Sequence, residues 1–166
     1  MALGLVRVDD RLLHGQVAIG WAGSLGSKLI VVANDDVAGN GWLRGIYEEA
    51  APQGVDVRIW TIEEAAAGTA ALLGDPETAI LVVKDPTDLL KLHEMGVEFA
   101  EANIGGMHYE EGKRELLPYV YVGDRDVRDM KTLLDSGVDL FAQDVPGGRR
   151  HEIRLLLDES DRADCS

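Results

Sequence analysis

Residues 6–17 read VRVDDRLLHGQV, a β-like run that ends in charged residues and passes through a histidine and a glycine into a helix-like pattern. The pattern predicts a helix from about residue 15 to residue 25. Its expected apolar face comprises Val17, Ile19, Trp21 and Leu25. A strand joined to a helix by a short polar loop is the repeating unit of parallel α/β sheets. This stretch therefore favours an α/β fold.

The same alternation continues along the chain. Short β-branched or aromatic runs predict strands at 3–8, 28–33, 56–60, 79–83, 97–104, 119–122 and 139–145. Several of these runs are apolar at nearly every position, which suits parallel strands covered on both faces. Helix-like segments lie between them. We expect a single α/β domain built on an open, mostly parallel, twisted sheet of about seven strands, with helices on both faces.

Two of the predicted helices carry clear start signals. Thr61 and Glu64 form a T-x-x-E capping box ahead of an alanine-rich segment. Asp85 and Pro86 supply an N-cap and a first-turn proline for the next helix, which Gly96 can end. These signals fix where the helices between the strands begin.

Composition narrows the class of protein. The net charge of −14 disfavours nucleic acid and anionic membrane surfaces as partners. Cys165 is the only cysteine, so neither a disulfide framework nor a cysteine metal site is expected. Charges begin at Arg7 and no run of about 18 apolar residues follows, so we expect neither a signal peptide nor a membrane span. These features predict a cytoplasmic protein.

The end of the chain differs from the rest in composition. Residues 147–166 are more polar, and we find no linker rich in Gly, Ser or Pro elsewhere. We expect a principal domain over 1–146 and a C-terminal extension over 147–166 that is partly frayed, in which EIRLLL could pack as a last helical turn or two.

The loop DDRLLHG (9–15) is a candidate site. Ligands of open parallel sheets bind at the carboxyl ends of strands, and His14 is expected at or just before a helix N-terminus, which favours phosphate. A histidine, with a reference pKa of about 6.5, is partly neutral and nucleophilic near neutral pH. A guanidinium such as that of Arg11 stabilises the equatorial oxygens of a transferring phosphoryl group. His14 and Arg11 are therefore candidate catalytic residues for phosphoryl transfer.

Asp9 and Asp10 admit more than one interpretation. They can cap the helix or pair with Arg7 and Arg11, which would orient the loop, or they can take part in chemistry. Together with His14 they could form a hydrolase site, which predicts phosphatase activity without a donor protein. The lack of a second cluster of carboxylate or histidine ligands counts against a hydrolase. We expect an orienting role for both carboxylates.

A second segment, NIGGM at 103–107, follows a predicted strand. Its paired glycines could let backbone N–H groups approach phosphate in a nest, or the segment could be a simple turn. Asn103, Gly105 and Gly106 are accordingly candidate neighbours of the site. Lys84, at another strand end, could add positive charge there or be a solvated lysine.

The remaining histidines have simpler interpretations. His93 lies in the last turn of a predicted helix, where a cation meets the negative end of the dipole. His108 could approach the site, although a loop histidine is more often at the surface, and His151 lies in the polar tail. Neither H-E-x-x-H nor a G-x-x-x-x-G-K-[ST] motif occurs, and no G-x-G-x-x-G opens the first helix. We expect no metal, nucleotide or other cofactor.

Four segments resemble, in this order, a known family. They are RVDDRLLHGQVAIGWAG, KLIVVANDDVA, AAPQGVDVRIWTIEEA and NIGGMHYEEGKRE. The family is the IIB component of the mannose/fructose/sorbose family of the phosphoenolpyruvate-dependent sugar phosphotransferase system. The likeness runs from about residue 5 to Pro146. Its most specific element is D-D-R-L-[IL]-H-G-Q-V close to the N-terminus, followed at the right distance by N-[IV]-G-G-M.

The resemblance implies a phosphoryl relay. A phosphohistidine of a IIA protein gives its phosphate to the IIB histidine, which passes it to a sugar that arrives through the IIC/IID membrane proteins. The matching residues are His14 as the phosphorylated nucleophile and Arg11 as the phosphate-binding residue, with Asp10, Gly15 and Gln16 in supporting places. The resemblance further implies a cytoplasmic protein associated peripherally with a membrane permease, and it allows a homodimer.

A second interpretation stays open at this point. Phosphorylated His14 could report sugar supply to an effector, in a regulatory binding protein that phosphorylates no sugar. Both functions need the same loop, so the sequence does not separate them. The sugar itself is not decided by this chain, because in the family the membrane components choose it.

Overall fold

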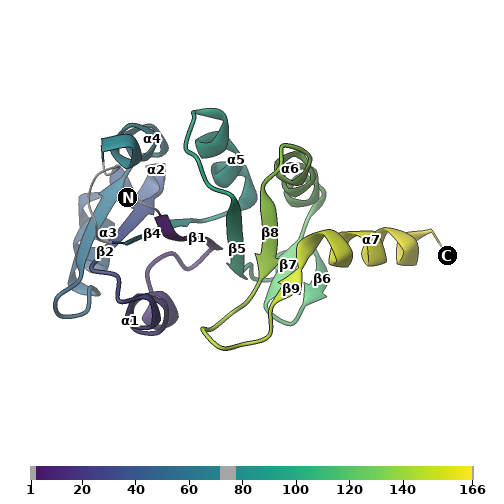
Figure 1. Cartoon of the computed structure of the whole chain (residues 1–166), viewed down its shortest axis with the longest axis horizontal. Coiled ribbons are helices and arrows are strands. Elements are labelled where there is room, and N and C mark those ends of the chain that lie inside the picture. Colours follow the sequence, from purple (N-terminus) through teal and green to yellow (C-terminus); the bar gives the residue numbers. More distant parts are fainter. Residues whose placement is uncertain (1–2, 72–77, 166) are drawn as a thin grey trace.

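The centre of the computed structural model, which describes residues 3–71 and 78–165, is a seven-stranded sheet (Figure 1). From edge to edge its strands are β3 (Asp56–Trp60), β2 (Leu29–Ala33), β4 (Ala79–Val83), β1 (Leu3–Asp9), β5 (Glu101–Gly106), β8 (Asp139–Ala142) and β9 (His151–Glu152). Neighbours from β3 to β8 pair in parallel, whereas β9 runs antiparallel to β8. The predicted α/β fold with an open, mostly parallel sheet is confirmed.

Helices cover both faces of this sheet, as predicted (Figure 1). One face carries η1 (Gln16–Trp21), α1 (Ala22–Leu25), α2 (Asp35–Ala38) and α3 (Gly41–Glu49). The other carries α4 (Ile62–Ala71), α5 (Pro86–Glu94), α6 (Asp124–Asp135) and α7 (Ile153–Asp164). Among the residues that the structure describes, no helix combines the length and the apolarity needed to cross a membrane.

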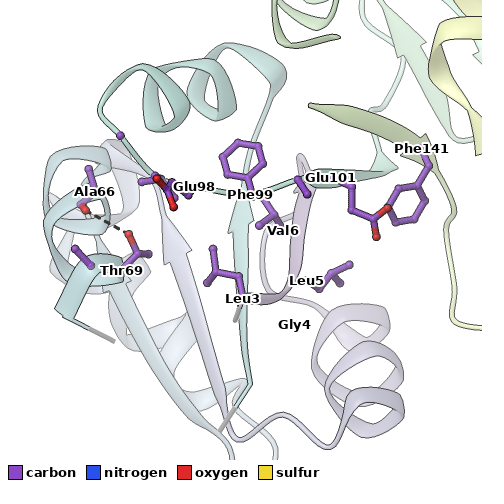
Figure 2. Close-up of a pocket in the computed structure, with 14 residues that line it drawn as sticks. Leu3, Gly4, Leu5, Val6, Ala66, Thr69, Glu98, Phe99, Glu101 and Phe141 are labelled. Atoms are coloured by element: carbon purple, nitrogen blue, oxygen red, sulfur yellow. Dashed lines mark hydrogen bonds between the residues drawn. The ribbon is translucent and has the colours of Figure 1, made fainter. Parts of the chain in front are cut away.

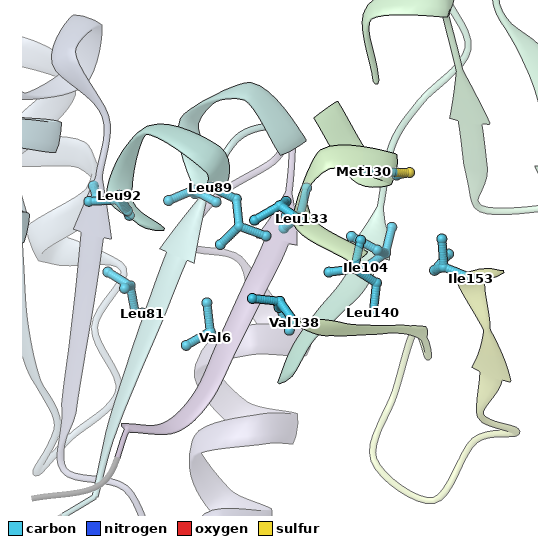
Figure 3. Packing of buried hydrophobic residues seen from close by; sticks show 14 of the residues in the cluster. Val6, Leu81, Leu89, Leu92, Ile104, Met130, Leu133, Val138, Leu140 and Ile153 are labelled. Atoms are coloured by element: carbon cyan, nitrogen blue, oxygen red, sulfur yellow. The ribbon is translucent and has the colours of Figure 1, made fainter. Parts of the chain in front are cut away.

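Strand alternation divides the core into two apolar clusters, one on each face. On the face of α5 and α6, the buried side chains of Val6, Leu81 and Ile104 lie against Leu89 and Leu133 (Figure 3). Removing one such leucine or isoleucine from water contributes about 1.5 to 3 kcal/mol. The parallel strands are therefore apolar on both sides because each side is covered.

The helix start signals act as predicted. The Thr61 N–H donates to Glu64 Oε2 (2.8 Å), and the Glu64 N–H donates back to Thr61 Oγ1 (3.0 Å). Asp85 Oδ1 accepts from the Asp88 N–H (2.8 Å) at the start of α5. Gly96 follows α5 with φ +94°, a conformation that favours glycine.

The first helix buries a different set of residues from the one predicted. Ile19 is 74% exposed and Leu25 is 37% exposed, although both were expected on the apolar face. The reason is that Ile19 lies two positions after Val17, on nearly the opposite side of a helix, whereas buried positions recur at i, i+1, i+4 and i+5. The buried side chains are those of Val17, Ala18, Trp21 and Ala22.

Some predicted strands have other bounds or partners. The strand expected at 97–104 begins later and extends through Gly106, and the one expected at 139–145 ends at Ala142. The prediction that segment 119–122 belongs to the main sheet is wrong. It forms β7 (Val120–Val122), which pairs with β6 (Arg114–Leu117) in a separate antiparallel pair. Over residues 3–71 and 78–165, only an isolated bridge joins this pair to the end of β5: Met107, whose N–H donates to the Tyr119 carbonyl (2.9 Å), pairs with Val120.

The C-terminal segment supplies the seventh strand instead. Residues 147–165, expected to be partly frayed, contain β9 and α7. Within α7, Ile153 is 0% and Leu157 is 1% exposed, because EIRLLL places both on one helix face, against the sheet. The boundary after residue 146 stays a prediction.

The sheet order positions the loop DDRLLHG. The chain after β1 runs to β2 on one side of β1, and the chain after β5 runs to β8 on the other side. Diverging connections of this kind leave a crevice at the carboxyl ends of two neighbouring strands, where ligands of open α/β sheets bind. The β1 loop and the segment after β5 meet at this crevice.

The packing of α7 predicts a graded response to truncation. Ile153→Ala or Leu157→Ala should lower the free energy of unfolding by about 2 to 5 kcal/mol, because each leaves a cavity in the core. Leu155→Ala on the same helix, at a side chain that is 60% exposed, should change it by less than about 0.5 kcal/mol. Urea denaturation followed by circular dichroism measures all three. Equally small losses at the three positions would contradict the anchoring of α7.

Candidate functional site

His14 lies directly before the first helix, in the place that the sequence predicts. Its carbonyl accepts from the Ala18 N–H (2.8 Å), and its side chain is 18% exposed. The ring is held from both sides: Nε2 lies 2.9 Å from Asp9 Oδ2, and the Gln16 N–H donates to Nδ1 (3.3 Å). A carboxylate can only accept, so Nε2 carries a proton and Nδ1 presents its lone pair.

Asp9 is the fully buried centre of the site. Its carboxylate accepts from His14 Nε2, from Arg7 Nη2 (3.0 Å) and from Arg11 Nε (3.1 Å), and its side chain is 0% exposed. Burial raises the pKa of Asp9, but the hydrogen bonds from His14 and Arg11 and the charge of Arg7 outweigh it and hold that pKa well below its usual range. Asp9 is therefore ionised and orients both neighbouring side chains.

Arg7, which the sequence suggests only as a possible ion-pair partner of the aspartates, is a buried component of the site. It is 0% exposed, and its guanidinium donates to Asp9, to Asn103 Oδ1 (2.6 Å) and to the carbonyls of Gln143 (3.1 Å) and Asp144 (3.0 Å). Burial lowers the pKa of Arg7, and the adjacent Asp9 carboxylate opposes this. The sequence does contain a pattern that indicates this pair. Strand alternation puts residues 7 and 9 on the same face of β1, where a positive and a negative side chain lie close enough to pair.

Asn103 and Gly105 position the side chain of Arg7. Both lie within β5, in neither a turn nor a loop, and Arg7 pairs in register with Asn103. A Cβ at Gly105 would overlap the Arg7 guanidinium, so only glycine leaves room for it. Gly106 is also tight, because a Cβ there would lie 3.1 Å from Asp9 Oδ1 and 3.2 Å from Arg11 Nη2.

Arg11 is the accessible cation of the cluster, with 37% of its side chain exposed. Its Nη2 donates to Asp9 Oδ2 (3.2 Å) and to Gln16 Oε1 (2.9 Å). Within the described ranges no acceptor engages its Nη1 group, whose two N–H donors are free for a ligand. Gln16 therefore touches both candidate catalytic residues, through its backbone N–H and its side-chain oxygen.

The loop between these residues is strained at one position. Leu12 has φ +58°, a left-handed conformation that costs a residue of this kind about 1 to 3 kcal/mol. Its N–H donates to the Asp9 carbonyl (2.9 Å), and its side chain is buried in the core. Packing and hydrogen bonds thus impose the turn that brings Arg11 and His14 to the same carboxylate.

Other predicted neighbours are placed differently. Asp10 bonds to His108 and not to His14. Lys84 pairs with Asp85 (3.9 Å), and no recorded contact in the described part of the chain joins it to the Asp9 cluster. The space beside the Gly15 backbone is open, which leaves His14 unobstructed on that side.

A larger cavity lies elsewhere (Figure 2). It has a volume of about 600 Å³ and lies at the amino end of the sheet, between Leu3, Leu5 and Phe99. Its charged lining residues are Glu98 and Glu101, which would repel a phosphate. In the described segments no group of three or more His, Cys, Asp or Glu side chains could hold a metal ion.

Comparison with known proteins identifies the family. Residues 3–165 match the family described as the PTS system sorbose subfamily IIB component. The chain is 37% identical over 155 residues to the N-acetylgalactosamine-specific phosphotransferase enzyme IIB component 1 of Escherichia coli K12, covering 90% of this chain and 94% of the relative. It is 30% identical over 166 residues to the mannose-specific EIIAB component of the same organism, covering 98% of this chain and 50% of that protein.

A solved structure agrees with these matches. The IIBSor domain of the sorbose permease from Klebsiella pneumoniae is similar with a TM-score of 0.89 at 32% identity, over 96% of this chain and 98% of that one. Together with the family match, this extends the likeness through α7. The chain belongs to the sorbose-subfamily IIB components of the phosphoenolpyruvate-dependent sugar phosphotransferase system, which are phosphotransferases of sugar uptake.

Proposed function

We propose that His14 carries the phosphoryl group from a phosphorylated IIA protein to a sugar, and that Arg11 stabilises that group in both transfers. The observation that carries the proposal is the Asp9 carboxylate, which binds His14 and Arg11 at 2.9 and 3.1 Å and so holds nucleophile and cation side by side. Positioning and charge stabilisation are what phosphoryl transfer asks of a protein.

The nucleophile is Nδ1 of His14. In the first transfer its lone pair exchanges the hydrogen bond from the Gln16 N–H for a bond to the phosphorus of the incoming phosphohistidine, and the P–N bond to the donor ring breaks. The His14 ring gains positive charge as the new bond forms, and Asp9 at Nε2 stabilises it. In the second transfer a sugar hydroxyl attacks the phosphorus, the P–Nδ1 bond breaks, and His14 leaves as a neutral imidazole.

Arg11 supplies the charge that faces the phosphoryl oxygens. Its free Nη1 group can donate to them, and one charge-assisted hydrogen bond contributes about 1.5 to 3 kcal/mol. Arg7 holds Asp9 in place through a fully buried hydrogen bond. The loop therefore has little reorganisation left to undergo when phosphate arrives.

IIB components of this family work with a IIA component and with membrane components of the permease. The mannose-specific EIIAB relative, half of which this chain matches, supports direct contact with a IIA domain. We assign the chain to the cytoplasmic face of the permease, where IIC and IID present the sugar. A homodimer stays a prediction from the family resemblance.

Loss of the nucleophile should abolish phosphate uptake. After incubation with phosphorylated IIA, the wild type should gain the mass of one phosphate and His14→Ala should gain none. His151→Ala, at a histidine in β9, is the matched control and should load as the wild type does. Intact-protein mass spectrometry gives the result, and a phosphate that persists in His14→Ala would refute the proposed carrier.

The hydrogen bonds of the ring predict which nitrogen is phosphorylated. Because Asp9 occupies Nε2, the phosphate should be bonded to Nδ1. NMR of the ¹⁵N-histidine-labelled phosphoprotein distinguishes the two ring positions. Phosphate on Nε2 would contradict the role given to Asp9.

Space for Arg7 should be essential to the site. Gly105→Ala forces the buried guanidinium to move, which should destabilise the fold by about 1 to 3 kcal/mol and slow phosphate uptake by about 100-fold. Gly45→Ala in α3, where added carbon meets open space, should instead stabilise the fold by about 0.5 to 1 kcal/mol. Thermal unfolding and the rate of labelling by phosphorylated IIA test both. A wild-type labelling rate in Gly105→Ala would show that the position of Arg7 does not matter to the site.

A further inference from the structure

A pocket of about 320 Å³ opens beside Arg11 at the crevice between β1 and β5. This volume falls within the range of about 300 to 1,000 Å³ that is usual for small-molecule sites. Arg11 and Gln16 line it from the β1 loop, and His108 lines it from the segment after β5. Gln16, which lines the pocket, also donates its backbone N–H to His14 Nδ1 (3.3 Å), so one residue connects the pocket to the proposed phosphorylated nitrogen.

The chemistry of the pocket suits a polyhydroxylated ligand. Tyr109, Tyr119 and Tyr121 give it an aromatic wall, in which Tyr109 packs edge-on against Tyr121 at 5.6 Å. The Tyr119 hydroxyl is buried and has no hydrogen-bond partner among the described residues. A buried hydroxyl without a partner costs free energy unless a ligand or water satisfies it.

His108 and Asp10 form a pair at the edge of this pocket. Asp10 Oδ2 accepts from the His108 N–H (2.7 Å), and Asp10 Oδ1 accepts from His108 Nδ1 (2.6 Å). The Asp10 N–H in turn donates to the Gly106 carbonyl (3.0 Å), which fixes the carboxylate on the sheet. With its proton on Nδ1, the His108 ring has a free lone pair on Nε2, and the side chain is 63% exposed.

We propose that this pocket receives the acceptor hydroxyl of a sugar and that His108 Nε2 takes its proton in the second transfer. As the hydroxyl oxygen bonds to phosphorus, the P–Nδ1 bond to His14 breaks and the O–H proton moves to His108. The resulting imidazolium is stabilised by Asp10 and returns its proton to solvent. His108 is a catalytic residue in this step and Asp10 is a positioning residue. The inference rests on the proposed relay through His14.

The two transfers differ in their need for such a base. In the first transfer the nucleophile is a neutral imidazole nitrogen, so no O–H proton has to be removed. In the second, a hydroxyl must lose its proton, and a positioned base contributes about 10² to 10⁴ in rate. A merely structural contact between Asp10 and His108 would instead support both transfers equally, since it would act by shaping the loop.

His108→Asn separates these cases. Asparagine keeps a side-chain N–H near the position of Nδ1, together with the backbone N–H, so the contact to Asp10 survives while the base is lost. Wild type, His108→Asn and a control, His151→Asn, are labelled with ³²P from phosphorylated IIA, and the labelling rate is recorded. Each labelled protein is then mixed with vesicles that hold its IIC and IID partners and with N-acetylgalactosamine, sorbose, fructose or mannose, and transfer to sugar is followed in a single turnover.

The proposal expects His108→Asn to label within about twofold of the wild-type rate and to pass label to sugar about 100-fold more slowly. His151→Asn should match the wild type in both steps. Transfer to sugar at the wild-type rate in His108→Asn would overturn the proposal, and so would an equal loss in both steps. Failure of the wild type to label at all would instead refute the relay on which the proposal rests.

Discussion

The buried carboxylate of Asp9 is the constraint on which the site depends. It accepts from Arg7, Arg11 and His14, three residues from a strand and the loop that follows it. An ionised carboxylate without partners would be too costly at 0% exposure, so the three donors and the carboxylate require one another. The same bonds that keep the Asp9 pKa low fix the imidazole tautomer and the place of the nearest guanidinium. Nucleophile, charge and orientation thus follow from one desolvated group.

That carboxylate needs a foundation, which the sheet provides. Arg7 lies flat across β5 because Gly105 has no side chain, and it is held by Asn103 at the position that pairs with it. Its other bonds reach the backbone carbonyls of the two residues that follow β8. Three neighbouring parallel strands therefore share one guanidinium, and the rigidity of the sheet passes to the loop. The left-handed Leu12 persists because this foundation over-determines the turn.

The sequence predicts the parts of this design that depend on local patterns. Runs such as LIVVA and AILVV are apolar at every position, which favours strands covered on both faces, and the DDRLLHG loop follows the strand-like run LGLVRV. The seventh strand and the place of segment 119–122 depend on long-range pairing, which two- and three-residue strands do not encode locally. Likewise, Gly105 gives no local signal of its purpose, because the side chain it accommodates is 98 residues away in the chain. Arg7 was expected only as a possible ion-pair partner of the aspartates and not as a buried part of the site, because an arginine in a strand is usually exposed.

The two adjacent aspartates show how strand geometry divides the work of a short motif. Successive residues of an extended chain point to opposite sides, so Asp9 and Asp10 cannot hold the same ring. Asp9 turns into the protein and binds Nε2 of His14, whereas Asp10 turns toward the segment after β5 and binds Nδ1 of His108. Opposite ring nitrogens are thereby left without a carboxylate partner: Nδ1 on the less exposed His14 ring, which accepts from the Gln16 N–H, and Nε2 on the more exposed His108 ring. Two adjacent aspartates at a strand end can therefore fix opposite tautomers of two histidines.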